Sequence, residues 1–331
     1  MIAPLTAVTP VQEIPFADAG GNHLWIKRDD LLPFSFGGNK VRIAASFLED
    51  CKSKGCDAMI LYGDRRSNLC RVLSAMNTAS FLDTVMIETS ENEQPDTVPF
   101  NERMIRLHGI RILPCRKTEI RSTVEYAMEV LRAEGKKPYY IYGNSLGEGN
   151  EGTAADAYVR ASDEILAWEK ASGIPIDYVF TACGTGSTLA GLAVGLLEGG
   201  SRAEVIGISI SSRSPERARS CVCRAAYDWY RRAGRKAPDC LETHLTVETA
   251  YNCGGYGRKD QRVLDLIRRV FLETSIPLDP TYTGKAFRGM LDYLKDHRIQ
   301  EKNILFLHTG GTPLFFDLLA EENGWAVGEK V

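Results

Sequence analysis

The chain has no long apolar run and no excess of one charge. No apolar stretch approaches the roughly 18 residues that a membrane-spanning helix needs, and residues 1–5 lack the basic start and apolar run of a secretory signal. The 40 lysines and arginines are balanced by 43 aspartates and glutamates and are scattered, which argues against a nucleic-acid surface. We therefore expect a cytoplasmic protein with neither a membrane nor a nucleic-acid partner.

Cysteine and histidine lack the spacing of a disulfide framework or a metal site. The nine cysteines are an odd number without framework spacing, which indicates reduced thiols. Cys221 and Cys223 form a close pair, but no second pair or nearby histidine completes a tetrahedral site. The sequence therefore predicts no bound metal.

Strand and helix patterns alternate along the 331 residues, which predicts an α/β fold with largely parallel sheets. A chain of this length is expected to form two domains. We predict a small four-stranded α/β domain over residues 46–152, and a large domain with a twisted, mostly parallel sheet over residues 1–45 and 153–331. The small domain's expected strands are 58–62, 84–88, 111–114 and 139–142. The large domain's include one at the start of segment 177–192 and others at 205–210, 245–247 and 303–307.

One lysine, Lys40, directly follows Gly37, Gly38 and Asn39. Adjacent glycines let a backbone approach a bound group closely or adopt a positive φ. A lysine held there can lose solvent, lower its pKa and attack an aldehyde. Taken alone, so short a motif is also compatible with a surface turn.

A second segment has the pattern of a phosphate site. Residues 177–192 are predicted to form a buried strand, a short polar loop and a helix, and the loop consists of Gly184, Thr185, Gly186, Ser187 and Thr188. Backbone N–H groups and the positive end of the helix would converge on an anion there. The loop lacks the Gly-Lys-Ser/Thr ending of a nucleoside triphosphate site.

A dinucleotide is the other ligand that Gly184-x-Gly186 could serve. That site needs an acidic residue at the end of the next strand, but the strand predicted at 205–210 is followed by Ser211 and Ser212. A single phosphate monoester fits better than a ribose. A reactive lysine together with a phosphate loop indicates pyridoxal 5′-phosphate as the cofactor, and makes a nicotinamide oxidoreductase the weaker alternative.

Taken together, the segments of this chain resemble the fold type II pyridoxal-phosphate enzymes, whose fold is like that of the tryptophan synthase β subunit. The resemblance is narrower to the branch with D-cysteine desulfhydrase and 1-aminocyclopropane-1-carboxylate (ACC) deaminase. It extends from about residue 24 to residue 313 and rests on seven segments in order: residues 25–30, 37–42, 67–68, 184–191, 255–257, 278–285 and 308–311.

The resemblance implies a role for each matching residue. Lys40 would bond covalently to the cofactor and then move the Cα proton of the substrate, and residues 184–188 would bind the phosphate. Asn68 would meet the cofactor's ring oxygen, and Ser67 the substrate. Tyr256 and Tyr282 would donate hydrogen bonds to the departing group or to the substrate carboxylate. The family also implies a homodimer.

The residues expected near the ring nitrogen of the cofactor help to choose between the two activities of this branch. The deaminases carry a glutamate directly after the second tyrosine, whereas this chain has Thr283, and Thr309 lies in the other segment expected near the ring nitrogen. A hydroxyl cannot keep the ring protonated as a carboxylate can. A weaker electron sink suits β-elimination better than cyclopropane opening, which favours the desulfhydrase.

The loop before Ser67 departs from the family pattern. It carries Arg65 and Arg66, and Leu69 replaces the polar residue expected after Asn68. Arginine suits bidentate recognition of anions. We therefore expect Arg65 and Arg66 to bind substrate, unless they face solvent or pair with Asp64, and the substrate to carry a second anionic group, as cysteate does.

These observations predict a lyase that eliminates the β-substituent of a small amino acid and yields pyruvate and ammonia. The same residues would also support β-replacement, in which a nucleophile captures the intermediate. ACC deamination is a third possibility. A protein that binds pyridoxal phosphate or an amino acid without catalysis is a fourth.

Overall fold

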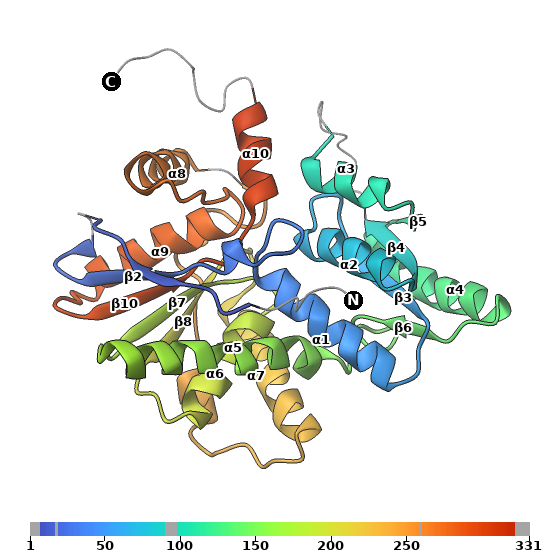
Figure 1. Ribbon diagram of the computed structural model, residues 1–331, viewed down its shortest axis with the longest axis horizontal. Helices are drawn as coiled ribbons and strands as arrows, with labels where there is room; N and C mark the ends of the chain where they lie inside the picture. The colour runs from blue at the N-terminus through green and yellow to red at the C-terminus, as the bar shows by residue number, and fades with distance from the viewer. Residues whose placement is uncertain (1–6, 17–18, 90–97, 259, 322–331) are drawn as a thin grey trace.

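The computed structural model describes residues 7–16, 19–89, 98–258 and 260–321. They form two sheets with helices packed around them (Figure 1). The strands are β1 (Val11–Glu13), β2 (His23–Lys27), β3 (Ala58–Gly63), β4 (Asp83–Thr89), β5 (Arg111–Cys115), β6 (Pro138–Tyr140), β7 (Tyr178–Cys183), β8 (Glu204–Ser209), β9 (Thr246–Glu248) and β10 (Asn303–Leu307). The α-helices are α1 (Asn39–Ser53), α2 (Asn68–Ala79), α3 (Phe100–Leu107), α4 (Ile120–Ala133), α5 (Glu151–Ser172), α6 (Ser187–Glu198), α7 (Pro215–Arg232), α8 (Gln261–Thr274), α9 (Thr283–Asp296) and α10 (Thr312–Ala320).

The large sheet has six strands in the order β1-β2-β10-β7-β8-β9. Only β1 runs antiparallel to its neighbour, and the other pairings are parallel. Helices α5, α6 and α7 lie on one side of this sheet and α8 and α9 on the other (Figure 1). Strands β7 and β10 are almost wholly buried, as expected of parallel strands covered on both faces. The α/β prediction is confirmed.

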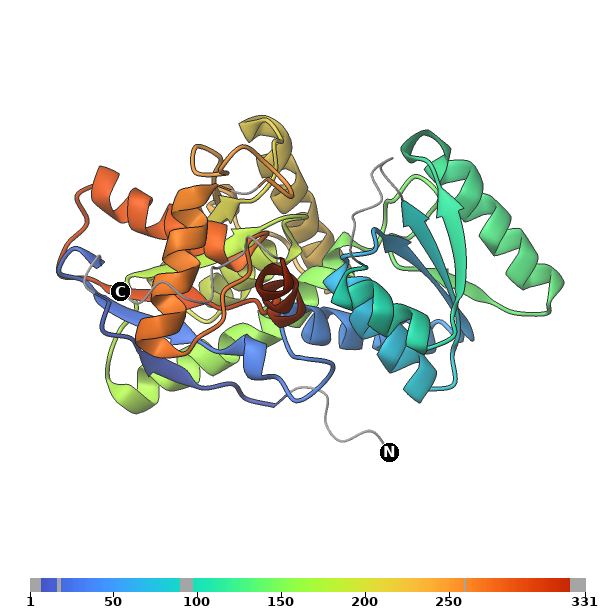
Figure 2. The ribbon, with the colours of Figure 1, turned by 90° about the horizontal axis from the view of Figure 1, so that it is seen from above.

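The small sheet has four parallel strands in the order β5-β4-β3-β6. Helices α2 and α4 contact it from opposite sides, as Figure 2 shows. The four strands start and end within two residues of the predicted bounds. The alternation of apolar and helical patterns therefore located this sheet correctly.

The chain leaves the large sheet through α1 and returns to it through α5. The two predicted domain boundaries fall inside α1 and in the first turn of α5, and the exact division stays a prediction. An apolar core runs from β3 and β4 through α1 into α5 and α6, so the two sheets share buried surface. A second core lies between the large sheet and helices α8 and α9.

The described parts of the chain contain no helix that is both long enough and apolar enough to cross a membrane. All nine cysteines lie within these parts and are free thiols.

Candidate active site

A cavity of about 340 Å³ lies where the two sheets face each other. Residues after the carboxyl ends of β3, β7, β8 and β10 line it, which is where parallel sheets place their ligands. The cavity brings together most of the residues that the sequence singled out: Lys40, Ser67, Asn68, Gly184, Thr185, Gly186, Ser187, Thr188, Tyr256, Tyr282 and Thr309.

Lys40 is the second residue of α1 and reaches the cavity. No described residue forms a hydrogen bond or ion pair with its Nζ. Burial disfavours the charged amine and lowers the pKa of Lys40 to about 8. A substantial share of this amine is therefore neutral near physiological pH, as a nucleophile must be.

The glycine pair before Lys40 packs backbone against backbone. Gly38 has φ +94°, and a Cβ atom there would lie 2.8 Å from the carbonyl oxygen of Thr309. A Cβ on Gly310 would come within 2.5 Å of the Cα of Gly38. The N–H of Asn39 also donates to the Thr309 carbonyl over 3.0 Å. The start of the lysine helix is thereby docked on the loop after β10, at a separation that only glycine permits.

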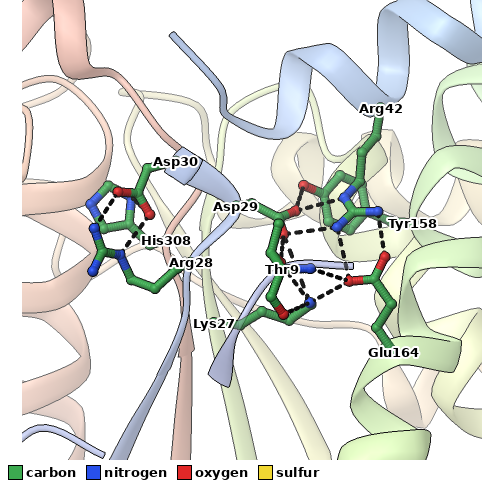
Figure 3. A network of polar contacts seen from close by, with 9 residues as sticks. All are labelled: Thr9, Lys27, Arg28, Asp29, Asp30, Arg42, Tyr158, Glu164 and His308. Atoms are coloured by element: carbon green, nitrogen blue, oxygen red, sulfur yellow. Dashed lines mark hydrogen bonds and ion pairs between the residues drawn. The ribbon is translucent and has the colours of Figure 1, made fainter. Parts of the chain in front are cut away.

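A buried polar network holds the next turn of α1 (Figure 3). Arg42 donates from Nε and Nη2 to the two carboxylate oxygens of Asp29, over 3.0 and 3.1 Å, and from Nη1 to Glu164 over 2.6 Å. Tyr158 donates to Asp29 over 2.6 Å. Burial raises the pKa of Asp29, but the guanidinium of Arg42, together with Lys27 and Thr9, outweighs it and leaves that pKa below its usual range. The network ties α1 to α5 two residues beyond Lys40.

Lys27 and Thr9 complete this network from the β2 side. The ammonium of Lys27 donates to Glu164 over 2.5 Å and to the Thr9 hydroxyl over 2.7 Å, and that hydroxyl donates to Asp29 over 2.6 Å. Because the buried charges are paired with good geometry, their desolvation is compensated. The polar residues of segment 25–30 thus have a structural role beside the lysine.

Arg28, Asp30 and His308 form a second buried group (Figure 3). Arg28 makes a bidentate pair with Asp30, with distances of 2.8 and 2.7 Å. The ring of His308 lies between the Pro277 carbonyl, 2.8 Å from Nε2, and the Gly310 N–H, which donates to Nδ1 over 3.1 Å. Nδ1 of His308 also lies 3.7 Å from a carboxylate oxygen of Asp30. These contacts fix the ring and order the loop that receives Gly38.

The predicted phosphate loop lies at the N-terminus of α6. Gly186 precedes the helix with φ +95°, and no side chain caps the first turn, so the N–H groups of that turn are left for a ligand. Asn39 donates from Nδ2 to the hydroxyl of Thr188 over 2.9 Å. The residue before Lys40 is thus bonded directly to the phosphate loop, and the uncapped turn fits a phosphate group.

Arg213 also lines the cavity, and the sequence analysis missed it. It follows β8, the strand beside β7, and its Nη1 donates to the carbonyl of Gly184 at the start of the phosphate loop. Its position after the carboxyl end of a parallel strand was the signal that could have identified it.

Asn68 presents a free amide to the cavity. Its Oδ1 accepts a hydrogen bond from Nδ2 of Asn101 over 3.0 Å, whereas its own NH₂ group has no partner among the described residues. Ser67 caps α2, and its hydroxyl accepts from the Cys70 N–H over 3.2 Å. A donor at Asn68 fits the ring oxygen of the expected cofactor.

Tyr256 and Tyr282 face each other, with their hydroxyl oxygens 3.0 Å apart. The Tyr256 hydroxyl also donates to Asp64 over 3.3 Å. Since its one proton is used there, Tyr256 accepts from the Tyr282 hydroxyl, and the donors run from Tyr282 through Tyr256 to Asp64. The side chain of Tyr256 is 47% exposed and that of Tyr282 is half-buried. Desolvation in the cavity raises the pKa of both phenols. Both remain protonated at neutral pH. Asp64, also in the cavity, is a second residue that the sequence analysis did not assign to the site.

Arg65 and Arg66 do not line the cavity, in contrast to their predicted role as substrate ligands. Nε of Arg65 lies 3.6 Å from a carboxylate oxygen of Glu102 on α3, and Arg66 is exposed. The cause is a tight turn before α2: the N–H groups of Arg66 and Ser67 bond to the side chain and carbonyl of Asp64, over 2.8 and 3.0 Å. This turn aims Ser67 inward and the two arginines away.

Thr283, which the sequence placed near the ring nitrogen, also lies outside the cavity lining. Its hydroxyl donates to a carboxylate oxygen of Asp279 over 2.7 Å and accepts from the Asp279 N–H over 2.7 Å. The carboxylate of Asp279 also accepts from the Thr283 N–H over 3.0 Å. Because the one proton of the Thr283 hydroxyl is already donated, the side chain has no donor left for a cofactor. Of the two threonines expected at the ring nitrogen, only Thr309 reaches the cavity.

The comparisons with known proteins agree with the expected cofactor. Residues 2–310 match the family model described as "Pyridoxal-phosphate dependent enzyme". Relatives from Pyrococcus abyssi and Pyrococcus horikoshii, both named "Putative 1-aminocyclopropane-1-carboxylate deaminase", are each 33% identical. The first match covers 93% of this chain and 90% of the relative, and the second covers 92% and 89%.

Solved structures give the same fold. A structure described as an ACC deaminase homologue is 31% identical, with a TM-score of 0.81 over 94% of this chain and 91% of that chain. A hydrogen sulfide-producing enzyme from Fusobacterium nucleatum has a TM-score of 0.64 at 18% identity, over 93% and 97% of the two chains. This second likeness establishes the fold alone.

Proposed function

Because the chain belongs to the family of pyridoxal-phosphate-dependent enzymes, we propose that it is a lyase that removes the β-substituent of a small amino acid, with D-cysteine as the first candidate. The choice of elimination over deamination rests on which carboxylates the site contains. Asp64 is the one carboxylate among the described residues that line the cavity, and it accepts a hydrogen bond from Tyr256. The position after Tyr282, where the deaminases have a glutamate, is filled by Thr283, which is bonded to Asp279.

Pyridoxal phosphate, the cofactor of this family, supplies an aldehyde for the lysine and a ring that delocalises negative charge from the substrate Cα. Lys40 is the residue that would hold it covalently. The first turn of α6 and Arg213 would hold the phosphate, and the amide of Asn68 would donate to the ring oxygen.

The chain's own residues then account for the proton transfers. The amine of Lys40, which has a pKa of about 8, takes the proton from the substrate Cα. The hydroxyl of Tyr282 or Tyr256 gives a proton to the departing sulfur, because both phenols stay protonated. The C–S bond breaks, sulfide leaves, and the released aminoacrylate is hydrolysed to pyruvate and ammonia.

The proposal gives D-cysteine priority over cysteate. The expectation of a second anionic group rested on Arg65 and Arg66, which lie outside the cavity lining. Arg213 does reach the cavity, but it is bonded to the phosphate loop. A substrate without a second anion therefore fits the described lining better.

ACC deamination is the second candidate, since the two 33%-identical relatives and the 31%-identical structure carry that name or description. β-Replacement would use the same residues. We also propose a homodimer, on the resemblance alone, and a cytoplasmic location, on the odd number of scattered cysteines.

A product assay with a panel of substrates tests these candidates. The protein is loaded with pyridoxal phosphate and given D- and L-cysteine, L-cysteate, O-phosphoserine, β-chloroalanine and ACC, and the keto acids are separated by chromatography. We expect pyruvate and sulfide from D-cysteine, and neither from Lys40→Ala. Formation of 2-oxobutanoate from ACC, with no pyruvate from the other substrates, would replace elimination by deamination. A visible absorption band with no keto acid from any substrate would indicate a binding protein or a synthase.

A further inference from the structure

Arg71 is a buried cation without a counter-ion. It lies on α2, three residues after Asn68, and its side chain is among the largest that are fully buried, with 1% exposed. Arg28 and Arg42, the other buried arginines of the described chain, each contact carboxylates. No described carboxylate lies within ion-pair distance of Arg71.

The partners of Arg71 are neutral. Its Nη1 donates to the hydroxyl of Ser35 over 2.8 Å, its Nη2 lies 3.5 Å from Oδ1 of Asn68, and its Nε has no partner. Ser35 belongs to the loop before Lys40 and has φ +44°. The guanidinium therefore bridges this loop and the amide that faces the cavity.

The charge persists despite its burial. Desolvation lowers the pKa of Arg71 to about 10, so the guanidinium is still protonated at neutral pH. An unpaired charge inside a protein is costly unless a ligand compensates it. An anion bound on the far side of Asn68 would provide that compensation.

Asn68 is suited to transmit this charge. Its Oδ1 faces two donors, Nη2 of Arg71 and Nδ2 of Asn101, so its NH₂ group is directed to the cavity and polarised as a donor. The group opposite this amide in the proposed complex is the ring oxygen of pyridoxal phosphate, which can be neutral or anionic.

We propose that Arg71 is a positioning residue that acts through Asn68 to keep the ring oxygen of the bound cofactor anionic. Its buried charge favours the anionic form, and its bond to Ser35 links that oxygen to the lysine loop. The inference rests on the family's cofactor and on the place of Asn68 in the proposed function, and it does not depend on which amino acid is the substrate.

The test uses the absorption spectrum of the loaded protein at one fixed neutral pH. The form with an anionic ring oxygen absorbs in the visible and the form with a neutral oxygen absorbs in the near ultraviolet. In Arg71→Gln, which keeps a polar side chain but lacks the charge, we expect the ratio of visible to ultraviolet absorbance to fall about tenfold, since a nearby charge shifts a pKa by one unit or more. The affinity of the apoprotein for pyridoxal phosphate should fall with it.

Two variants separate charge from geometry. Asn101→Ala removes the other donor to Asn68 and keeps the charge, so its ratio should stay within about twofold of the parent. Arg71→Lys keeps a cation and should do the same, and it supplies the test if the neutral variant fails to fold. An unchanged ratio in Arg71→Gln, an equal fall in Asn101→Ala, or a collapse of the ratio in Arg71→Lys would each overturn the proposal. These spectra are recorded without an amino-acid substrate. A negative result would therefore refute the role of Arg71 without bearing on the proposed reaction.

Discussion

The side-chain amide of Asn39 donates a hydrogen bond to the hydroxyl of Thr188 over 2.9 Å. Asn39 is the first residue of α1 and Thr188 the second of α6, so two helix N-termini meet through this bond. Both side chains are buried. The bond sets the distance between Lys40, the proposed covalent anchor of the cofactor, and the loop proposed for its phosphate.

Loss of this bond should weaken cofactor binding. We expect Asn39→Ala and Thr188→Val each to lower the affinity of the apoprotein for pyridoxal phosphate about fivefold, since one buried hydrogen bond contributes about 1 kcal/mol. In the double variant the loss should resemble that of either single variant, because the same interaction is removed. Fluorescence titration measures the three affinities, and additive losses would show that the two residues act independently.

The low pKa of Lys40 predicts how cofactor loading depends on pH. The neutral amine attacks the aldehyde, and burial makes it dominant above a pKa of about 8. Below that value the loading rate should fall about tenfold for each pH unit. Stopped-flow absorbance between about pH 6 and about pH 10 measures the rate, and a plateau reached only near the ordinary lysine pKa of 10.5 would contradict the prediction.

Gly38 should not tolerate a side chain. In Gly38→Ala the new Cβ would lie 2.8 Å from the Thr309 carbonyl oxygen at φ +94°, and we expect a loss of at least about 2 kcal/mol in the free energy of unfolding together with weaker cofactor loading. Gly149→Ala is the matched control, because its φ is +111° with nothing within 4 Å. Urea denaturation compares the two. Equal losses would mean that the positive φ alone, and not the contact with Thr309, sets the cost.

Asp29 should make the protein sensitive to acid. The pKa of this carboxyl is held below the usual 3.8 by Arg42, so its stabilisation is complete above the unfolded-state pKa and is lost as the pH falls through the lower folded-state pKa. We expect Asp29→Asn to lower the free energy of unfolding at neutral pH by about 3 to 5 kcal/mol, and by less in strong acid. Glu49→Gln, which removes an exposed pair with Arg160, should cost under about 1 kcal/mol at any pH. A cost for Asp29→Asn that does not shrink in acid would contradict this account.

Arg213 should discriminate between phosphorylated and unphosphorylated cofactor. Because its guanidinium is bonded to Gly184 of the phosphate loop, we expect Arg213→Met to weaken pyridoxal phosphate binding at least about tenfold, and to leave the binding of pyridoxal, which has no phosphate, unchanged. Arg66→Met, on the surface, is the control. An equal effect on both ligands would place Arg213 elsewhere in the site.

Local patterns in the sequence were enough to predict the layers of the fold and the kind of cofactor. Apolar runs and helical periodicity predicted both sheets, because a strand that is buried on both faces needs a run of apolar residues in any fold. Glycines beside Lys40 and at 184–186 predicted a reactive amine and an anion loop, because their conformations are properties of the residues themselves. Here the sequence by itself determined the fold class and the kind of cofactor.

Side-chain direction was decided by tertiary structure alone. Arg65 and Arg66 precede Ser67, yet the turn around Asp64 directs them away from the cavity. The hydroxyl of Thr283 is bonded to Asp279 and does not reach the cavity. Arg213 does line the cavity, although the sequence analysis did not consider it. Which way a residue points depends on hydrogen bonds to partners that no local pattern specifies. The neutral surroundings of Arg71 depend in the same way on Ser35, which is 36 residues away in the chain and is brought beside it only when the loop before α1 packs against α2.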